Sequence, residues 1–383
     1  MRGVPLAWLQ LTREKQRFSV AVAGIAFAVI LMLVQLGLRD ALYESATKLL
    51  DRLQGDIVIT SSQYEYLFST DHFSRRWLYS ALALDEVEWV APLYLGMGTW
   101  REPERFEERK ILVIGYIPST PLLDFPEVRQ YSQEIQLPDL VLFDRASRPE
   151  YGPVVSMFAR DHGVTTEVNG RRINVGGFFT LGPTFGSNAH LLTSDSNFLQ
   201  IFRNRQQGLI DLGFIKLKSG ADGNQVAAKL RAFMPRDVNV HTRQVLAEQE
   251  KNYWDRHLPL GFIFNLGSLM GLTVGGVVVY QILFADVNDQ LSEYATLKAL
   301  GYFDRDLFKI VLKESAMLSV IGFVPGYAVA QVLYLVAHAK AGVPIQMTLS
   351  RVILVFIMTL VTCGISGVIA MQKLRLADPA DIF

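Results

Sequence analysis

Four stretches of the chain contain no Asp, Glu, Lys or Arg, and they constrain the fold more than any other feature. They cover residues 18–38, 258–285, 315–337 and 352–372, and are 21, 28, 23 and 21 residues long. Because a helix rises about 1.5 Å per residue, roughly 20 apolar residues cross the core of a bilayer. We therefore predict four transmembrane helices. A soluble globular protein is excluded, and so is a fully embedded bundle, because most of the 383 residues lie outside these stretches.

Basic residues in the short flanking segments predict the orientation of the helices. Residues 1–17 form a predicted cytoplasmic amphipathic segment with four basic residues, Arg2, Arg13, Lys15 and Arg17. Lys and Arg favour the cytoplasmic side, so we expect the N-terminus inside. The first apolar run is longer than that of a signal peptide and no small-residue cleavage pattern follows, so we expect it to be retained. The predicted cytoplasmic segments are then 1–17, 286–314 and 373–383, and the external ones 39–257 and 338–351.

The external segment 39–257 has the pattern of an α+β domain on a helical stalk. Apolar residues at helical spacing continue the first helix outward to Gly55, and residues 245–257 form a second helix that leads into the membrane. Strand, helix and strand patterns follow each other in about 55–100 and again in 209–242, which predicts a split pair of βαβ units. The expected strand, helix and strand are Asp56–Ser61, Phe73–Leu84 and Val87–Gly96 in the first unit, and Leu212–Leu217, Gly223–Phe233 and Val238–His241 in the second. Short strand candidates between them predict a β-rich insertion at about 101–208. The predicted fold class is an α-helical membrane protein with four transmembrane helices and a large α+β external domain.

Glycines recur at four-residue spacing in two of the predicted membrane helices. They are Gly267, Gly271 and Gly275 in the second helix, and Gly322 and Gly326 in the third. This spacing puts small residues on one face, where another backbone can approach closely. The alternative is that glycine is simply common in membrane helices. We favour helix packing, and the sequence leaves open whether it occurs within or between subunits.

The sequence contains no pattern that indicates an enzyme or a metal site. It has no P-loop, no HExxH and no GxSxG motif. The six histidines have no metal-ligand spacing, and the single cysteine, Cys363, excludes a disulfide within the chain. The 37 basic and 37 acidic residues balance, without a basic tail for nucleic acid. We therefore expect no catalytic residues, no metal and no cofactor of its own.

The cytoplasmic segment 286–314 contains a short amphipathic helix pattern that ends at a glycine. Glu293 and Lys298 are expected to be exposed, Leu297 lies on the apolar face next to Ala299, and Gly301 ends the helix. Such a helix either docks a partner protein or lies on the lipid surface, and its composition favours neither.

The run EYATLKALG at residues 293–301 resembles the E-x-[GA]-x-L-[KR]-A-[LM]-G pattern of FtsX/MacB-type ABC transporter permeases, also called type VII. In that superfamily the motif follows the second membrane helix and meets the ATPase. Longer segments resemble the DevC subfamily, namely PLAWLQLTREKQR (5–17), AGIAFAVILMLVQLGLRDAL (23–42), LVLFDRASRPEYGP (140–153), SDSNFLQIF (194–202), MGLTVGGVVVYQIL (270–283) and KLRLADPADIF (373–383).

This resemblance implies partners and a mechanism. DevC-like permeases work as homodimers in the bacterial inner membrane with a separate DevA-like ABC ATPase, which binds the ATP. A DevB-like adaptor of the HlyD type and a TolC-like outer-membrane channel complete the exporter, and the described relatives export envelope glycolipids. The superfamily implies mechanotransmission, in which ATP-driven motion reaches a MacB-like periplasmic domain. Glu293, Leu297, Lys298, Ala299 and Gly301 would then form the ATPase-coupling element.

Three other functions remain open on the sequence. An FtsX-like transducer would regulate periplasmic cell-wall hydrolases and would bind a hydrolase or its activator. A lipoprotein-releasing permease would hand its cargo to a soluble carrier. A stand-alone receptor would act without any ATPase.

Overall fold

The computed structural model describes residues 14–69, 71–161, 163–257, 259–289, 304–341 and 345–376. The chain divides into two compact units. The helical unit combines Met1–Ala41 with Pro259–Phe383, and the α+β unit is Leu42–Leu258. Each unit has its own buried apolar core, as expected when a polar external segment interrupts apolar membrane helices.

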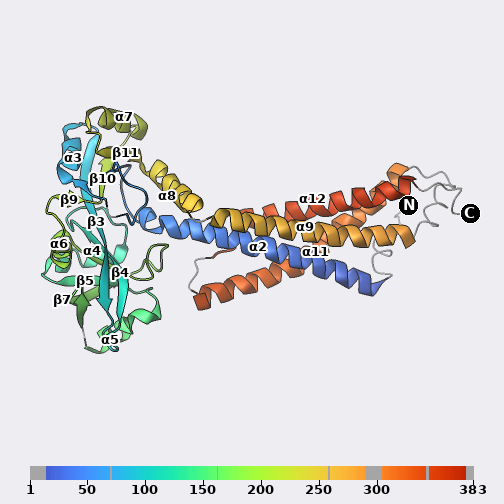
Figure 1. The fold of residues 1–383 in the computed structure, drawn as a ribbon, viewed down its shortest axis with the longest axis horizontal. Helices are drawn as coiled ribbons and strands as arrows, with labels where there is room; N and C mark the ends of the chain where they lie inside the picture. Colours follow the sequence, from blue (N-terminus) through green and yellow to red (C-terminus); the bar gives the residue numbers. More distant parts are fainter. Residues whose placement is uncertain are drawn as a thin grey trace, which may run out of the picture. The chain divides into compact units, whose positions relative to one another are not determined.

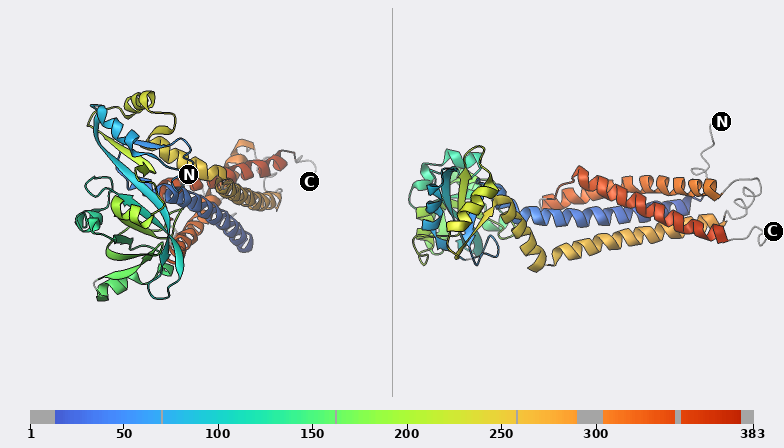
Figure 2. Two further views of the ribbon diagram at one scale, coloured as in Figure 1. Left: turned by 60° about the vertical axis from the view of Figure 1, so that its left-hand side comes forward. Right: turned by 90° about the horizontal axis from the view of Figure 1, so that it is seen from above.

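Four long helices make up the described part of the helical unit, and they run side by side in Figures 1 and 2. They are α2 (Lys15–Asp51), α9 (Leu260–Asp289), α11 (Asp304–Ala341) and α12 (Leu349–Leu376). By length and composition, all four can cross a membrane. The predicted fold class, four such helices with a large α+β domain, is confirmed. Helix α2 ends at Asp51, four residues before the glycine at which the sequence predicted its end.

The core of the helical unit is built around α2. Ile25, Ala28 and Met32 of α2 are buried together with Leu318 of α11 and Cys363 of α12. Cys363 therefore serves as a small packing residue. Side chains on the outer faces of α9, α11 and α12 are apolar and exposed, as lipid-facing side chains are.

The α+β unit contains, in its described part, a nine-stranded mixed sheet with the order β11-β1-β10-β3-β4-β8-β5-β7-β6. The strands are β1 (Ile57–Ser61), β3 (Val87–Arg101), β4 (Glu108–Tyr116), β5 (Leu140–Asp144), β6 (Val164–Val168), β7 (Arg171–Phe179), β8 (His190–Ser194), β10 (Leu212–Leu217) and β11 (Val238–Thr242). A separate pair joins β2 (Phe73–Ser74) to β9 (Leu209–Ile210). The helices of this unit are α3 (Arg75–Ser80), α4 (Pro126–Gln130), α5 (Val154–Asp161), α6 (Asp195–Ile201), α7 (Gly223–Phe233) and α8 (Arg243–His257).

The two strand–helix–strand units interlock. Strand β1 lies between β10 and β11, and β10 lies between β1 and β3, with antiparallel pairing throughout. Each unit thus inserts one strand between the two strands of the other, as in a split βαβ fold. Strand β10 and helix α7 have the bounds expected from the sequence, and β3 is five residues longer than the expected strand.

The middle of the chain extends the same sheet. The 15-residue strand β3 pairs with β10 through Val87–Leu93 and with β4 through Leu93–Arg101. At its far end β3 also pairs with β6, which closes β3, β4, β8, β5, β7 and β6 into a ring. The β-rich insertion and the split βαβ part are therefore joined by one continuous strand.

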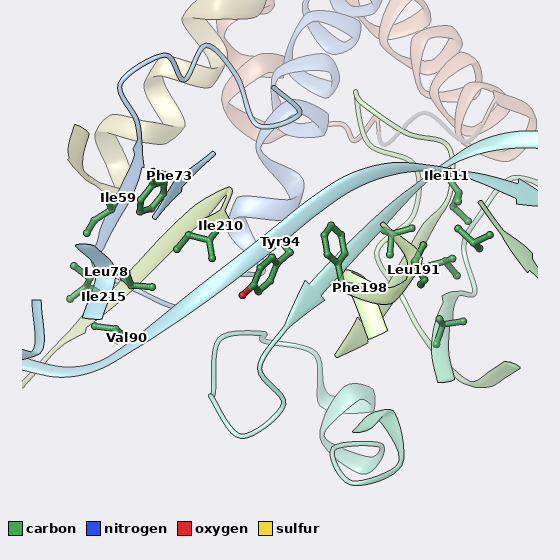
Figure 3. Close-up of a cluster of buried hydrophobic side chains, with 14 of the residues drawn as sticks. Ile59, Phe73, Leu78, Val90, Tyr94, Ile111, Leu191, Phe198, Ile210 and Ile215 are labelled. Carbon is green, nitrogen blue, oxygen red and sulfur yellow. The ribbon is translucent and has the colours of Figure 1, made fainter. Parts of the chain in front are cut away.

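A buried apolar cluster follows the sheet from one part to the other (Figure 3). Ile59, Leu78 and Ile215 lie in the split βαβ part, and Ile111 and Leu191 lie in the ring. The rings of Tyr94 and Phe198, 5.5 Å apart, connect them. Burial of this cluster stabilises both parts as one unit.

One predicted helix differs from the structure. The sequence predicted a helix over residues 73–84, but Phe73 and Ser74 form strand β2, and the helical part is α3 followed by a 3₁₀ turn at Ala81–Ala83. Phe73 is buried in the apolar cluster, and the Ser74 hydroxyl accepts a hydrogen bond from Arg76 N–H. This serine cap starts the helix two residues late, because an N-cap residue has extended backbone.

Candidate functional site

The predicted ATPase-coupling element lies outside the described residues. Helix α9 ends at Asp289 and α11 begins at Asp304. Glu293, Leu297, Lys298, Ala299 and Gly301 fall between these positions. Their role stays a prediction.

The five glycines at four-residue spacing all lie against α2. A Cβ atom added at any of them would lie 3.0 Å or less from an α2 atom, so that α2 or the neighbouring helix would have to shift. In α9, Gly267, Gly271 and Gly275 face Gln35, Leu31 and Ala28 of α2, respectively. In α11, Gly322 faces Ile25 and Gly326 faces Ala26 of α2. The structure therefore places these close contacts within one chain, between α2 and both α9 and α11.

A polar cluster that the sequence did not predict joins all four long helices. Arg351, at the start of α12, is 6% exposed, and its Nη2 and Nε atoms donate to Asp40 Oδ2 of α2 at 2.8 and 3.2 Å. The neighbouring Arg39 donates to Asp40 Oδ1 at 3.0 Å and to Asn265 Oδ1 of α9 at 3.0 Å. Asp40 is thus shared between two guanidinium groups. We call Arg39, Asp40, Asn265, Tyr334 of α11 and Arg351 the arginine clasp.

Tyr334 extends the clasp into the space between α11 and α2. Its hydroxyl donates to the Leu33 carbonyl, and Arg351 Nη1 donates to Tyr334 Oη at 3.3 Å and to the Gln346 carbonyl at 2.7 Å. The ring reaches α2 only because Gly37 has no side chain, since an added Cβ would lie 2.0 Å from Tyr334 Oη. Hydrogen-bonded charges of this kind, with Arg351 buried and Asp40 partly exposed, fix the register of packed helices.

A signal for the clasp is present in the sequence. Asp40 comes two residues after the first apolar stretch, and Arg351 comes directly before the fourth. The predicted topology puts both at the external ends of their helices. Opposite charges at the same membrane boundary are natural partners, but only the structure shows which pair meets.

A buried histidine in the α+β unit has the contacts of a catalytic triad without its accessibility. His190 Nδ1 lies 3.1 Å from Asp144 Oδ2, and its Nε2 lies 3.0 Å from Thr184 Oγ1. Asp144 and His190 are fully buried and Thr184 is 7% exposed. Asp144 also accepts the backbone N–H groups of Leu181 and Gly182. No substrate could reach this group, so we assign it to anchoring the loop before β8.

The part of the sequence that contains the last three long helices matches a known protein family. Residues 265–379 match the family model for the FtsX-like permease C-terminal region. The match covers most of α9 and all the described residues of α11, and reaches the end of α12. It supports the FtsX-like permease superfamily that the EYATLKALG run indicates.

Curated relatives match a similar share of the chain. The pyoverdine export ATP-binding/permease protein PvdT of Pseudomonas syringae pv. tomato is 34% identical over 116 residues, and that of Pseudomonas fluorescens is 31% identical over 120 residues. These matches cover 30% and 31% of this chain. The chain spans only 18% of the length of either relative.

Two solved structures resemble parts of the chain. The periplasmic region of MacB from Actinobacillus actinomycetemcomitans has a TM-score of 0.35 and 10% identity, covering 52% of this chain and 94% of that one. The extracellular domain of the ABC-type transporter YknZ from Gram-positive bacteria has a TM-score of 0.34 and 12% identity, covering 49% of this chain and 98% of that one.

Proposed function

We propose that the chain is the permease subunit of an ABC exporter. The match of residues 265–379 to the FtsX-like permease C-terminal region is the observation that carries this proposal. The four apolar helices and the large α+β unit support it. In this proposal the chain binds no nucleotide, and a separate DevA-like ATPase hydrolyses ATP.

The mechanism that we propose is mechanotransmission. ATP-driven closure of the two ATPases would act on residues 286–314 of a permease homodimer, and the close contacts of α2 with α9 and α11 would carry the motion outward. The membrane stretches 18–38, 258–285, 315–337 and 352–372 contain no Asp, Glu, Lys or Arg, which suits a device that moves without an ion pathway. Both termini would be cytoplasmic and the α+β unit periplasmic in a bacterial inner membrane.

The finer proposal concerns cargo and partners. By the DevC resemblance, the exporter would include a DevB-like adaptor of the HlyD type and a TolC-like channel, and its cargo would be a lipid-like molecule such as an envelope glycolipid. The curated relatives are named for pyoverdine export, which gives a second cargo class to test.

Affinity purification of the tagged chain from mild detergent tests the assembly. An ABC ATPase together with an HlyD-like adaptor is the expected result. An ATPase with a cell-wall hydrolase would instead indicate the FtsX-like transducer, and an ATPase with a lipoprotein carrier would indicate lipoprotein release. Recovery of the folded chain with no ATPase would contradict the permease assignment.

Replacing Gly301 by proline is expected to weaken ATPase association by at least about tenfold. Proline cannot adopt the left-handed backbone of a helix-ending glycine, and it forces Leu300 out of helical conformation. Co-purification yield and ATPase stimulation measure the effect, and Glu293→Ala should lower stimulation as well. The control Glu248→Ala removes a carboxylate from an exposed position of α8 and should change neither. Unchanged association in Gly301→Pro would rule out the coupling role.

A further inference from the structure

A basic pocket lies in the α+β unit, and its lining shares no residue with the coupling element, the arginine clasp or the His190 group. Its volume is about 530 Å³. The β6–β7 turn and the start of β7 form one wall, and the end of α6 and the segment that follows it form the other. Its lining includes Arg171, Arg203 and Arg205, and among the described lining residues there is no carboxylate.

The turn at the pocket wall is fixed in place. Asn169 and Gly170 have φ angles of 52° and 71°, which is the left-handed backbone of a two-residue type I′ hairpin turn. Asn169 accepts a hydrogen bond from Thr99 N–H through its side-chain oxygen at 2.8 Å, and its own N–H donates to the Thr99 carbonyl at 3.0 Å. The side chain also donates to the Ile201 carbonyl at 3.5 Å. The two walls are therefore joined before any ligand arrives.

Two of the three arginines are held by hydrogen-bond partners within the domain. Arg171 Nε donates to Asp139 at 2.5 Å, and its Nη2 donates to Gln200. Arg205, whose side chain is 9% exposed, donates to the Leu95 carbonyl at 3.2 Å and to Asp211. These bonds fix both guanidinium groups, so little side-chain entropy is left to lose on binding.

Arg203 differs from the other two arginines. It is exposed at the pocket wall, and the described residues include no hydrogen-bond or ion-pair partner for it. Three arginines and the two aspartates behind them, Asp139 and Asp211, leave the group with one net positive charge. One singly charged carboxylate balances this charge, and it also fits the planar fork of a guanidinium.

We propose that this pocket is a binding site for a carboxylate. The inference goes beyond the permease function and does not depend on it. The carboxylate could belong to a glutamate or aspartate of a partner protein or to a small organic acid, and the test below separates the two sources.

Calorimetric titration of the purified full-length chain in detergent tests the site. The probes are glutarate and a glutamate-rich peptide, each at constant ionic strength. We expect at least one probe to bind and Arg203→Glu to weaken that binding roughly tenfold or more, because a charge-assisted hydrogen bond is replaced by repulsion. Arg160→Glu, an equal charge reversal at an exposed position of α5, is the matched control and should leave binding unchanged.

The outcomes are distinct. Tighter binding of the peptide would assign the site to a partner protein, and tighter binding of glutarate would assign it to a small acid. Failure of both probes to bind would overturn the proposal. Equal weakening by Arg203→Glu and Arg160→Glu would overturn it too, because the attraction would then come from the overall charge of the domain.

Discussion

Replacing Gly37 by alanine is expected to destabilise the helical unit by about 2–4 kcal/mol. The new Cβ would lie 2.0 Å from Tyr334 Oη and 2.5 Å from its Cζ. Tyr334 is 3% exposed and its hydroxyl is held by Leu33 and Arg351, so the ring has no room to retreat. The substitution must therefore push α11 away from α2 or break the hydrogen bond to Leu33. This loss exceeds the roughly 1 kcal/mol by which alanine is a better helix former than glycine.

Thermal unfolding of the purified protein in detergent measures the effect. Gly364→Ala is the matched control, because the nearest atom to its new Cβ is Leu312 Cδ1 at 3.9 Å. That variant should be as stable as the parent or slightly more stable. Tyr334→Phe removes the closest atom, so its combination with Gly37→Ala should cost less than the sum of the two changes. Equal stability of Gly37→Ala and Gly364→Ala would show that the Tyr334 contact does not hold α2 to α11.

The long apolar helices could be predicted from the sequence, because an uninterrupted run of about 20 residues without a charge is enough to identify each one. The charge-free stretch 258–285 corresponds to α9, which begins at Leu260, and 352–372 lies within α12. The structure adds polar ends to these helices. Helix α12 begins at Leu349, which brings Arg351 into its first turn. A hydropathy pattern cannot predict the hydrogen bonds between Arg351 and Asp40, because the two residues are 311 positions apart in the sequence.

The α+β unit shows the same division between local and long-range information. Strand β10 and helix α7 could be predicted because alternation and helical spacing are local signals. The closure of the ring through Trp100↔Val168 and Arg101↔Glu167 could not, because it pairs strands more than 60 residues apart. The helix predicted over residues 73–84 includes the short strand β2 for a similar reason, since the partner strand β9 is far along the chain.

The three arginines of the pocket form no recognisable motif in the sequence, so the pocket could not be predicted from them. Arg171 lies in a strand, whereas Arg203 and Arg205 follow α6. The turn Asn169–Gly170 is a strong local hairpin signal, but nothing local brings it next to residues 200–205. The burial of Glu250 could not be predicted from the sequence either, because most residues of α8 are polar and nothing distinguishes Glu250 from them.

Glu250 is expected to make the protein less stable as the pH rises from about 4.5 to about 7. Its side chain is fully buried in α8, and burial raises its pKa from 4.5 to about 7, although the hydrogen bond from Tyr64 at 2.5 Å opposes the rise. Among the described residues no basic side chain forms an ion pair with it. In the unfolded chain the carboxyl ionises near 4.5. Between the two values the folded state holds more protons, so the free energy of unfolding falls with rising pH.

The expected loss across this window is about 3 kcal/mol, since each pH unit between the two pKa values contributes about 1.4 kcal/mol. Glu250→Gln keeps the size of the side chain and an acceptor for Tyr64, but it has no charge to bury. We expect this variant to lose this part of the pH dependence and to be more stable than the parent at pH 8. Thermal unfolding of the full-length protein between pH 5 and pH 9 measures both effects.

Glu248→Gln is the matched control for this prediction, because Glu248 is exposed on the same helix and should leave the pH dependence unchanged. If Glu250→Gln kept the slope of the parent, or were less stable at pH 8, the carboxyl would be ionised at little cost in the folded protein. The aromatic contacts next to it, with the Trp254 ring 4.0 Å from Phe185 and 5.3 Å from Tyr66, would then fail to exclude water from α8. A positive result would mean that α8 is packed around a neutral acid below about pH 7, because burial without a counter-ion destabilises the charged form.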